Sequence, residues 1–288
     1  MKDSAILIIA SDNYLPHAKA LMVNCVRQGK WADDFCLMCP SGCDTSCIEG
    51  RGIEIVRAPE SHWSNIIKCR IFDSQFRRWQ RLLYLDCDIL IQGNLNDTCA
   101  ELAKRFPAIL CDGPQLSSIL DDWVHFDELG GTGRDSHPEV YERLRERFPH
   151  IDSQILTADA MFFDPATIPD STVDDLFAIQ AEFVEANPGG YDQQVINLLL
   201  YDRLRPMTKD HCCWWAFDDP GNRVPNKERG WRGDEEPTIL HYWNMYAPWL
   251  EKTPDAGAYF NHRLNRVCHE LYQENLAAFK EVFPCLTK

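Results

Sequence analysis

Arg81-Leu-Leu-Tyr-Leu-Asp86-Cys-Asp88-Ile-Leu-Ile-Gln-Gly-Asn94 is a stretch in which an apolar run stops at two carboxylates and then resumes. The run over residues 82–85 shows no polar alternation, which favours a strand covered on both faces in a parallel or mixed sheet. Ligands of open α/β sheets bind beyond the carboxyl ends of such strands, where Asp86 and Asp88 fall. Carboxylate oxygens with open coordination positions suit Mg²⁺ or Mn²⁺ bridging to phosphates. The stretch therefore predicts a strand that delivers a metal site.

An Asp-x-Asp pair on its own has a simpler interpretation. Asp86 then caps a turn and Asp88 is solvated, because aspartate is a common turn residue. The rest of the chain has to distinguish the metal site from the solvated turn.

The composition narrows the classes of function. At 288 residues with a hydrophobic fraction of 45%, the chain suits one elaborated α/β domain. Its formal net charge of −15 argues against a nucleic-acid groove and against docking on anionic lipid. An acidic protein that binds an anionic substrate needs a local positive charge, which a divalent cation supplies.

The N-terminus and the cysteines bear on the compartment. The apolar run near the N-terminus is too short for a signal peptide or a membrane span, so we expect a soluble, cytoplasmic protein. Thirteen scattered cysteines predict reduced thiols rather than a disulfide framework. Cys36 and Cys39 have zinc-ligand spacing, but they sit on an apolar, strand-like segment with no second pair, which favours core thiols.

Strands and helices alternate along the first half of the chain, as in a doubly wound sheet. The expected strands are residues 5–10, 34–38, 53–56, 82–85, 108–111, 158–163 and 238–244. The expected helices are residues 18–27, 63–78, 97–106 with Asp97 as the cap, 138–148, 174–185 and 192–201. The sequence contains no Gly-x-Gly-x-x-Gly and no Walker motif, so neither a dinucleotide nor a P-loop is indicated.

We predict one α/β domain over residues 1–250. Residues 112–150 turn polar and are expected to be an insertion over the sheet, and the irregular residues 210–237 are long enough to be a lid loop. Residues 251–288 are expected to be a C-terminal helical extension packed on the same domain, because their apolar residues recur near the helical period.

Several stretches, in the right order, resemble glycosyltransferase family 8, which includes glycogenin and bacterial lipopolysaccharide galactosyl- and glucosyltransferases. The strongest match is residues 83–95, similar along their whole length to the family's metal-binding Asp-x-Asp segment. The other matching stretches are Ala10-Ser-Asp12-Asn-Tyr14, Lys68, Asp192-Gln193 and His241-Tyr-Trp-Asn244-Met-Tyr-Ala247-Pro-Trp249. The resemblance implies a single GT-A (Rossmann-like) domain, in which helices flank a mostly parallel central mixed sheet.

The resemblance also implies a set of site residues. Asp86, Asp88 and His241 would hold Mn²⁺, or Mg²⁺, against the diphosphate of a UDP-sugar, where the cation neutralises charge on the leaving UDP. The implied nucleotide-sugar-binding residues are Ala10, Asp12, Tyr14, Lys68, Asp86, Cys87 and Asp88. The implied catalytic residues are Asp192, Gln193 and Asp159. The alternatives are structural: a turn aromatic at Tyr14, a lysine snorkelling on a helix face at Lys68 and a helix N-cap at Asp192.

The chain departs from the family's pattern in two places. The family usually has Asn-Ala-Gly where this chain has Thr157-Ala158-Asp159, and a missing glycine changes how closely the backbone can approach a ligand. The family commonly has Gly and a Lys where this chain has Asn244 and Ala247, which removes a charge-assisted contact to the diphosphate worth about 1.5 to 3 kcal/mol. The candidate replacements for that lysine are Arg223, Lys227, Arg229 and Arg232.

The resemblance favours a metal-dependent, retaining hexosyltransferase. Its donor would be UDP-glucose or UDP-galactose, and its acceptor a glycan, a lipid-linked sugar or a protein. The acceptor side is expected over residues 117–135 and 214–231, whose ring-bearing residues suit sugar stacking: Trp123, His125, Trp214, Trp215 and Trp231.

Two other functions remain open. A catalytically weak or inactive nucleotide-sugar-binding protein on the same scaffold is the alternative, motivated by Asp159, Asn244 and Ala247. A nucleotidyltransferase would want a glycine-rich phosphate loop after the first strand, and Ser11-Asp12-Asn13-Tyr14 has no glycine.

Overall fold

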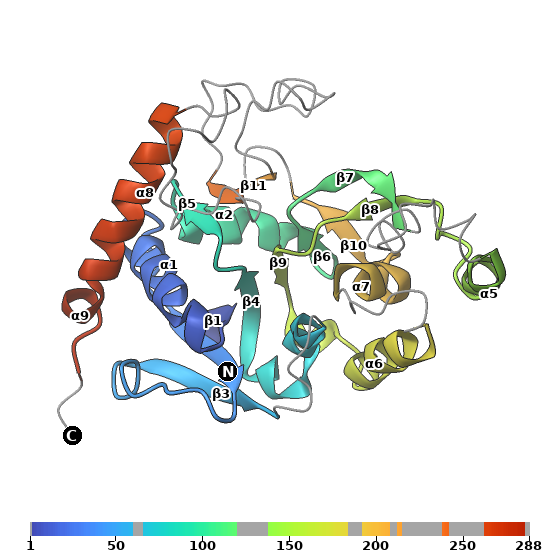
Figure 1. Ribbon diagram of the computed structural model, residues 1–288, viewed down its shortest axis with the longest axis horizontal. Coiled ribbons are helices and arrows are strands. Elements are labelled where there is room, and N and C mark those ends of the chain that lie inside the picture. Colours follow the sequence, from blue (N-terminus) through green and yellow to red (C-terminus); the bar gives the residue numbers. More distant parts are fainter. Residues whose placement is uncertain are drawn as a thin grey trace.

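The computed structural model describes residues 2–59, 66–119, 138–183, 192–207, 212–214, 238–241 and 262–285. A central sheet of seven strands runs through the middle of the molecule, with helices on both sides (Figure 1). In spatial order its strands are β10 (Leu204–Pro206), β6 (Ile109–Cys111), β9 (Ala160–Phe163), β4 (Trp79–Leu85), β1 (Lys2–Ile9), β2 (Asp34–Pro40) and β3 (Ile53–Ala58).

One strand of this sheet runs against the others. β9 pairs antiparallel with both β4 and β6, whereas the remaining neighbours pair parallel. Leu85 at the end of β4 lies opposite Ala160 at the start of β9, and Cys111 at the end of β6 lies opposite Met161. The residues that follow β4 and β6 therefore meet the residues that precede β9 at one edge of the sheet. The predicted mostly parallel mixed sheet is confirmed.

The apolar run of β4 is covered on both faces, as predicted. Leu82 and Tyr84 belong to one hydrophobic core cluster, while Leu83 and Leu85 belong to the other. Successive side chains of a strand point to opposite faces, so a run without polar residues is stable only when both faces are buried. The two clusters lie on the two faces of the sheet and bury the run over residues 82–85.

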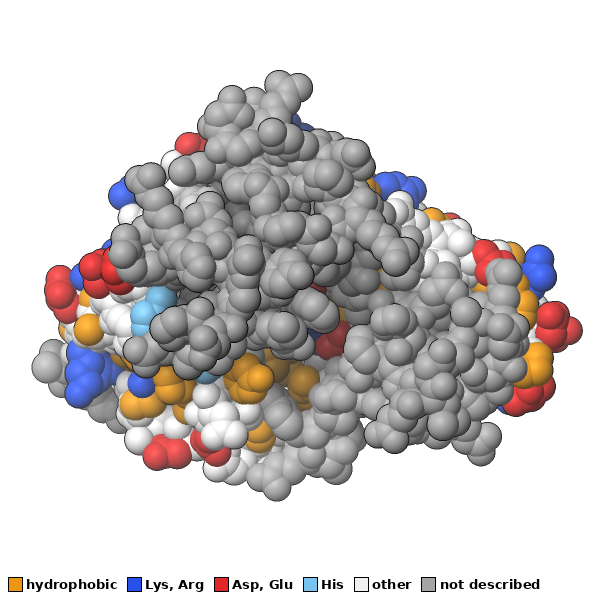
Figure 2. Space-filling model, turned by 45° about the horizontal axis from the view of Figure 1, so that its top comes forward, with side chains coloured by type: hydrophobic (Ala, Val, Ile, Leu, Met, Phe, Trp, Pro, Cys, Tyr) orange, Lys and Arg blue, Asp and Glu red, His pale blue; other side chains and the backbone are white. Residues whose placement is uncertain are grey.

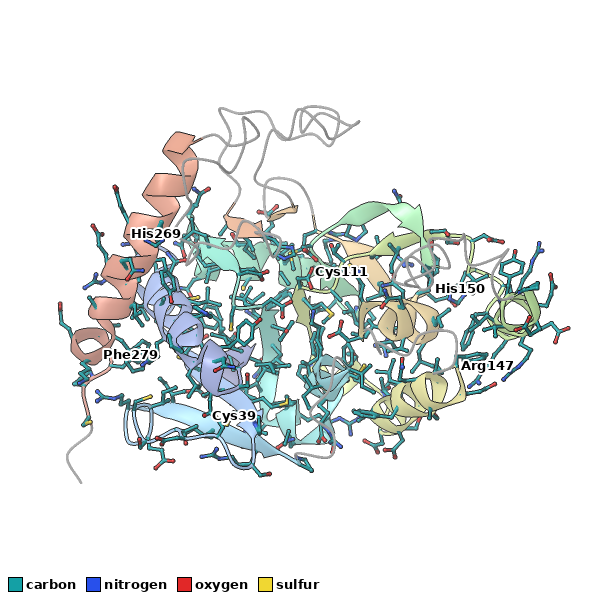
Figure 3. All side chains as sticks on the ribbon, in the orientation of Figure 1. Cys39, Cys111, Arg147, His150, His269 and Phe279 are labelled. Carbon is teal, nitrogen blue, oxygen red and sulfur yellow. The ribbon has the colours of Figure 1, made fainter. Side chains whose placement is uncertain are left out.

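Helices from distant parts of the chain supply these two clusters. One face is covered by α6 (Thr172–Glu182), α7 (Asp192–Leu200) and α5 (Pro138–Arg147). The other face is covered by α1 (Leu15–Arg27), α2 (Leu95–Leu102) and α9 (Phe279–Val282). The amphipathic C-terminal helix α8 (His262–Ala277) lies along α1 (Figure 1), and Phe279 of α9 packs beside it (Figure 3).

A second, three-stranded sheet completes the edge where β4 ends. Its strands are β11 (Cys212–Trp214), β12 (Ile239–His241) and β5 (Ile89–Ile91). β12 pairs antiparallel with β5, so that His241 lies opposite Ile89, the residue after Asp88. Gly93 permits this approach, because a Cβ atom there would stand 2.8 Å from Oγ1 of Thr238, just before β12.

Two expected helices differ in the structure. Residues 66–78 form two 3₁₀ segments, Ile67–Phe72 and Ser74–Arg78, separated by the extended residue Asp73. The Asp73 carboxylate accepts the N–H of Gln75, and such a local side-chain bond competes with a continuous helix. The helix expected from Asp97 begins at Leu95 instead, because Asn94 is its N-cap and accepts the N–H groups of residues 96 and 97.

The polar region after β6 is described at its two ends. β7 (Pro114–Ser118) pairs with β8 (Gln154–Leu156), and α5 follows at residue 138; residues 120–137 lie outside the described part. Acidic and basic side chains lie beside one another at both ends of the face in Figure 2.

Within the described residues, no helix is long and apolar enough to cross a membrane.

The cysteines with zinc-like spacing lie in and beside β2. Cys36, Cys39 and Cys43 are buried free thiols, and Cys47 is exposed. An Arg57 guanidinium nitrogen lies 3.4 Å from Sγ of Cys39 and donates to the backbone carbonyl of Cys43 at 2.7 Å. Burial raises the pKa of the Cys36 thiol well above its ordinary value.

Candidate active site

Three aspartates from three strand ends meet at the edge described above. Asp86 follows β4, Asp159 precedes β9 and Asp112 follows β6. The Asp86 N–H donates to the Asp159 carbonyl oxygen at 2.8 Å, which extends the β4–β9 pairing by one step. The sheet itself therefore brings the carboxylates together, although their residues are far apart in the chain.

Lys68 lies between Asp86, Asp159 and a further carboxylate, Asp192. It is carried by the 3₁₀ segment Ile67–Phe72, and its Nζ lies 2.9 Å from Asp86 Oδ2, 2.8 Å from Asp159 Oδ1 and 3.7 Å from Asp192 Oδ1. Burial opposes the charged ammonium, but the surrounding carboxylates raise the pKa of Lys68 well above its ordinary value. The lysine is therefore a fixed positive charge and does not snorkel to solvent.

Burial raises and Lys68 lowers the pKa of each neighbouring aspartate, and the net shift differs from one to the next. Burial raises the pKa of Asp86 well above its ordinary value despite the nearby Lys68, and burial also raises the pKa of Asp192. Burial works against ionised Asp159 as well, but Lys68 and His241 together lower the pKa of that carboxyl. Tyr84 donates its hydroxyl to Asp86 from inside β4. Asp159 is thus the carboxylate that these two cations hold ionised.

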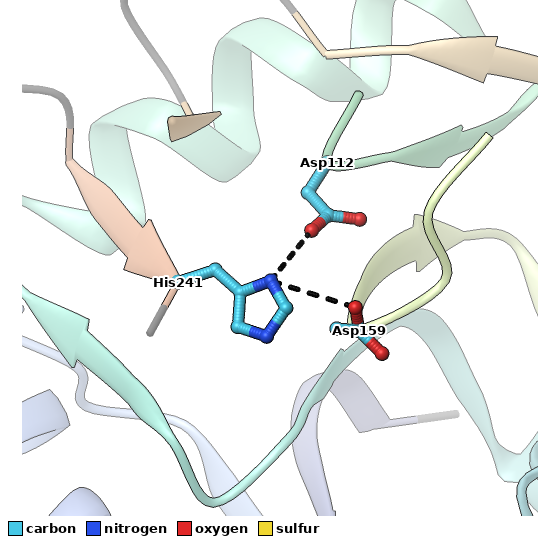
Figure 4. A group of neighbouring side chains, drawn as sticks. All are labelled: Asp112, Asp159 and His241. Atoms are coloured by element: carbon cyan, nitrogen blue, oxygen red, sulfur yellow. Dashed lines mark ion pairs between the residues drawn. The ribbon is translucent and has the colours of Figure 1, made fainter. Parts of the chain in front are cut away.

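His241, at the end of β12, faces carboxylates with both ring nitrogens. Nδ1 lies 3.3 Å from Asp112 Oδ2 and 3.4 Å from Asp159 Oδ2 (Figure 4), while Nε2 lies 3.6 Å from Asp88 Oδ1. Burial opposes the charged imidazolium, but Asp159 and Asp88 raise the pKa of His241 well above its ordinary value.

The described residues contain one group with metal-ligand geometry, formed by Asp112, Asp159 and His241, whose ligand atoms all lie within 4.8 Å of one another. The expected triad is arranged differently. Asp88 meets His241, whereas the carboxylate of Asp86 turns to Lys68. Carboxylate oxygens with one imidazole nitrogen are suitable ligands for a divalent cation. Both oxygens of Asp112 are buried and accept no hydrogen bond of standard geometry from the described residues, so the donor set fits such an ion.

Asp112 is the site residue that sequence reasoning missed. The sequence pattern at Asp112 is the same as at Asp86: the apolar strand Ile109-Leu-Cys111 stops at a carboxylate. The strand was expected, but nothing local indicates that β6 and β4 both pair with β9.

The expected nucleotide-binding residues lie beside β1. Ala10 follows β1 and is buried, while the 3₁₀ segment Asp12–Tyr14 leaves Tyr14 half-exposed, at 50%. Asp12 Oδ1 accepts the N–H of Asp44 at 2.9 Å, so this carboxylate shapes a loop and stands outside the charged cluster. Cys87 Sγ lies 3.5 Å from the Ile9 carbonyl oxygen, which ties the Asp-x-Asp turn to the end of β1.

The remaining expected residues fall at the start of α7 or outside the described part. Asp192 begins α7, and Gln193 Oε1 accepts the N–H of Ala158 at 3.4 Å, next to Asp159. The other expected residues lie outside the described residues: Asn244, Ala247, Arg223, Lys227, Arg229, Arg232, Trp123, His125, Trp215 and Trp231, with most of the lid segment 210–237.

Comparison with known proteins gives structural likeness at low sequence identity. No protein-family model matches the chain, and no curated protein matches it. The glycosyltransferase GlyE of Streptococcus pneumoniae TIGR4 is 14% identical with a TM-score of 0.59, over 100% of this chain and 66% of GlyE. The galactosyltransferase LgtC, in complex with donor and acceptor sugar analogs, is 14% identical with a TM-score of 0.57, over 94% of this chain and 95% of LgtC. The bifunctional glycosyltransferase WbbM is 15% identical with a TM-score of 0.59, over 98% of this chain and 51% of WbbM.

The chain has the GT-A fold. At these identities the likeness establishes the fold alone, and the chain spans only about two thirds of GlyE and half of WbbM. In this GT-A sheet the chain leaves β1 toward β2 on one side and later returns to β4 on the other. Ligands of open α/β sheets bind at such a switch point, which here lies between Tyr14 after β1 and Asp86 after β4.

Proposed function

We propose that the protein is a metal-dependent, retaining glycosyltransferase that moves a hexose from UDP-glucose or UDP-galactose to a carbohydrate-containing acceptor. The observation that carries this proposal is the convergence of Lys68, the aspartates and His241 at the switch-point edge of a GT-A sheet. A buried cluster of opposed charges after β4, with a partly exposed aromatic residue after the neighbouring strand β1, suits a charged substrate with a flat base. The similar structures GlyE, LgtC and WbbM are glycosyltransferases, which supports the same class.

In this proposal Asp88 and His241 hold Mn²⁺ or Mg²⁺, joined by Asp86 once it leaves Lys68. Supporting this, Asp88 Oδ1 and His241 Nε2 lie 3.6 Å apart, and the Asp88 side chain is 19% exposed. When bound, the ion supplies Lewis-acid stabilisation of the charge on the leaving diphosphate.

The donor would be oriented by residues on both sides of that ion. Tyr14 stacks on the base and Ala10 and Cys87 contact the nucleotide, consistent with the half-exposed Tyr14 ring. Lys68 lies on the sugar-phosphate side. Asp192, Gln193 and Asp159 accept or donate hydrogen bonds at the sugar hydroxyls near the reactive carbon. We assign no nucleophile, and a cytoplasmic location remains a prediction from the sequence.

A nucleotide-sugar-binding protein with weak or no turnover is the second candidate. The contacts of Lys68 favour it, because three carboxylates surround the ammonium and any phosphate must compete with them. The two candidates differ in turnover. Binding alone raises the melting temperature with UDP concentration and releases no UDP from a UDP-sugar.

The test measures UDP release from UDP-glucose and from UDP-galactose with Mn²⁺, Mg²⁺ or a chelator. We expect metal-dependent release that Asp88→Asn lowers at least tenfold, as loss of a metal ligand should. Asp202→Asn, a change at an exposed aspartate outside the cluster, is the matched control and should leave release unchanged. Absence of release with both donors, together with unchanged UDP binding in Asp88→Asn, would overturn the proposal.

A further inference from the structure

The two ring nitrogens of His241 face different surroundings. On the Nε2 side stands Asp88, whose side chain is 19% exposed, next to Asp86 in the turn after β4. On the Nδ1 side stand Asp112 and Asp159 (Figure 4). Asp112 is the fully buried carboxylate on the Nδ1 side, whereas Asp88 and Asp159 are 19% and 18% exposed.

Asp112 and Asp159 are not equivalent on the Nδ1 side. Asp159 has a second cation, because its Oδ1 lies 2.8 Å from Lys68 Nζ. The Asp112 side chain is fully buried, and its oxygens accept no hydrogen bond of standard geometry within the described part of the chain. A buried carboxylate without a partner is strongly destabilising. The nearest ring nitrogen is His241 Nδ1, which lies 3.3 Å from Asp112 Oδ2.

Backbone pairing fixes the position of the His241 Cα but not the orientation of the imidazole ring. The register of β12 against β5 places the His241 Cα opposite Ile89. Rotation about the two side-chain torsions could still present either nitrogen to Asp88. A carboxylate that accepts the N–H of one ring nitrogen selects both the tautomer and the ring orientation.

We propose that Asp112 is the positioning residue of this site: it accepts the Nδ1–H of His241 and so directs Nε2 and its lone pair toward the ion held with Asp88. The proposal rests on the metal-dependent function proposed above. Asp112 contacts neither the ion nor the substrate, and it acts only through His241.

The opposite arrangement places the ion on the Nδ1 side, between Asp112, Asp159 and His241, where the ligand atoms also lie within 4.8 Å of one another. That position is less suited to catalysis. Its carboxylate Asp112 is fully buried, whereas a catalytic ion needs an open coordination position that substrate can reach. Asp159 on that side is also engaged by Lys68.

The first experiment measures Mn²⁺ affinity, through the electron paramagnetic resonance signal of free Mn²⁺, with UDP present and no turnover. We expect Asp112→Ala to weaken Mn²⁺ binding about 10- to 100-fold, the range for loss of a residue that orients a metal ligand. Asp112→Asn, whose amide oxygen can still accept Nδ1–H, should lose less. Asp202→Asn is the surface control, and circular dichroism at the assay temperature identifies any variant that fails to fold.

The second experiment asks which nitrogen binds, with the same signal. The side-chain amide of Gln can reach the position of Nε2, and that of Asn the position of Nδ1. We therefore expect His241→Gln to retain more Mn²⁺ affinity than His241→Asn. This comparison does not depend on Asp112 variants being stable.

Three outcomes would overturn the proposal, and they can be told apart. Asp112→Ala with wild-type affinity shows that Asp112 has no positioning role, while the metal-dependent function stands. A second outcome is that Asp112→Asn lowers Mn²⁺ affinity as much as Asp88→Asn does, while His241→Asn retains more affinity than His241→Gln. That result would place the ion at Nδ1. A wild-type protein that binds neither Mn²⁺ nor Mg²⁺ overturns the metal-dependent function as well.

Discussion

The side-chain amide of Asn24 makes the two backbone hydrogen bonds that a neighbouring strand would otherwise make with Ile91. The Ile91 N–H donates to Asn24 Oδ1 at 2.6 Å, and Asn24 Nδ2 donates to the Ile91 carbonyl oxygen at 3.1 Å. Asn24 is on α1 and almost wholly buried, so the helix holds the outer edge of β5 while β12 pairs with its inner edge. The segment that carries Asp88 is thereby fixed from both sides.

Asn24→Ala should destabilise the fold markedly. The change leaves the buried N–H and carbonyl of Ile91 without partners, at a cost of about 1 to 3 kcal/mol for each group. Urea unfolding measures the loss. Asn96→Ala, which removes an exposed contact to the Lys30 carbonyl, is the control and should cost under about 1 kcal/mol. Equal losses for the two variants would contradict this role of Asn24.

Lys68→Met should destabilise the protein by about 3 to 5 kcal/mol, because it leaves buried carboxylates without their cation. Arg27→Met removes an exposed ion pair with Glu281 and should cost at most about 1 kcal/mol. Urea unfolding at pH 8 compares the two. A loss below about 1 kcal/mol for Lys68→Met would show that the carboxylates do not depend on it.

The loss of unfolding free energy caused by Lys68→Met should become smaller as the pH is lowered from 8 to 5. Without the ammonium, the pKa values of Asp86, Asp159 and Asp192 in the folded protein rise above those in the unfolded chain, as burial already does for Asp86. A raised carboxyl pKa contributes stability at low pH, and this contribution is lost as the pH rises through the folded-state value. Unfolding curves at both pH values provide the measurement. A deficit that grows on acidification would contradict the assignment.

Gly93→Ala should displace β12. The added Cβ would stand 2.8 Å from Thr238 Oγ1 and 3.3 Å from Thr238 Cα, and that hydroxyl is already bonded to Thr98. Overpacking of this kind costs about 1 to 3 kcal/mol, and His241 follows on the same strand, so Mn²⁺ affinity should fall too. Gly113→Ala, where a Cβ meets no atom within 4 Å, is the matched control for urea unfolding. Unchanged Mn²⁺ affinity in Gly93→Ala would contradict the coupling.

Acidification should weaken the contact between α1 and α8. His17 Nδ1 and the Tyr272 hydroxyl are 2.7 Å apart, and burial lowers the pKa of His17 from 6.5 to about 4, although Asp88 opposes the shift. The unfolded chain therefore binds the proton more readily, and stability is lost as the pH falls from about 6.5 to about 4. The ring is partly exposed, so solvent screening reduces the effect.

The measurement is the melting temperature at pH 7 and at pH 5. The difference between the two pH values should be smaller for His17→Gln than for the wild type. Tyr272→Phe should lower stability at pH 7 by about 0.5 to 1.5 kcal/mol, the net value of one hydrogen bond. The same pH dependence in His17→Gln and the wild type would contradict a role for His17.

Local sequence patterns predicted secondary structure correctly where the residues of one segment were enough to determine it. The apolar run over residues 82–85 predicts a strand buried on both faces, because any exposed face of it would be unfavourable, and β4 is that strand. Over the described residues 66–78 the expected continuous helix was wrong, because the Asp73 carboxylate accepts the N–H of Gln75 and this local bond competes with the helix. The cap expected at Asp97 belongs to Asn94 for a similar local reason.

The sequence by itself determined that apolar strands end at Asp86 and Asp112, and that His241 lies on another short strand. Only the tertiary structure decided that these groups meet. β9 runs antiparallel between β4 and β6, and β12 pairs with β5 in the register that sets His241 beside Asp88. The physical reason is that strand register between distant segments depends on which faces become buried together, and neither segment alone contains that information.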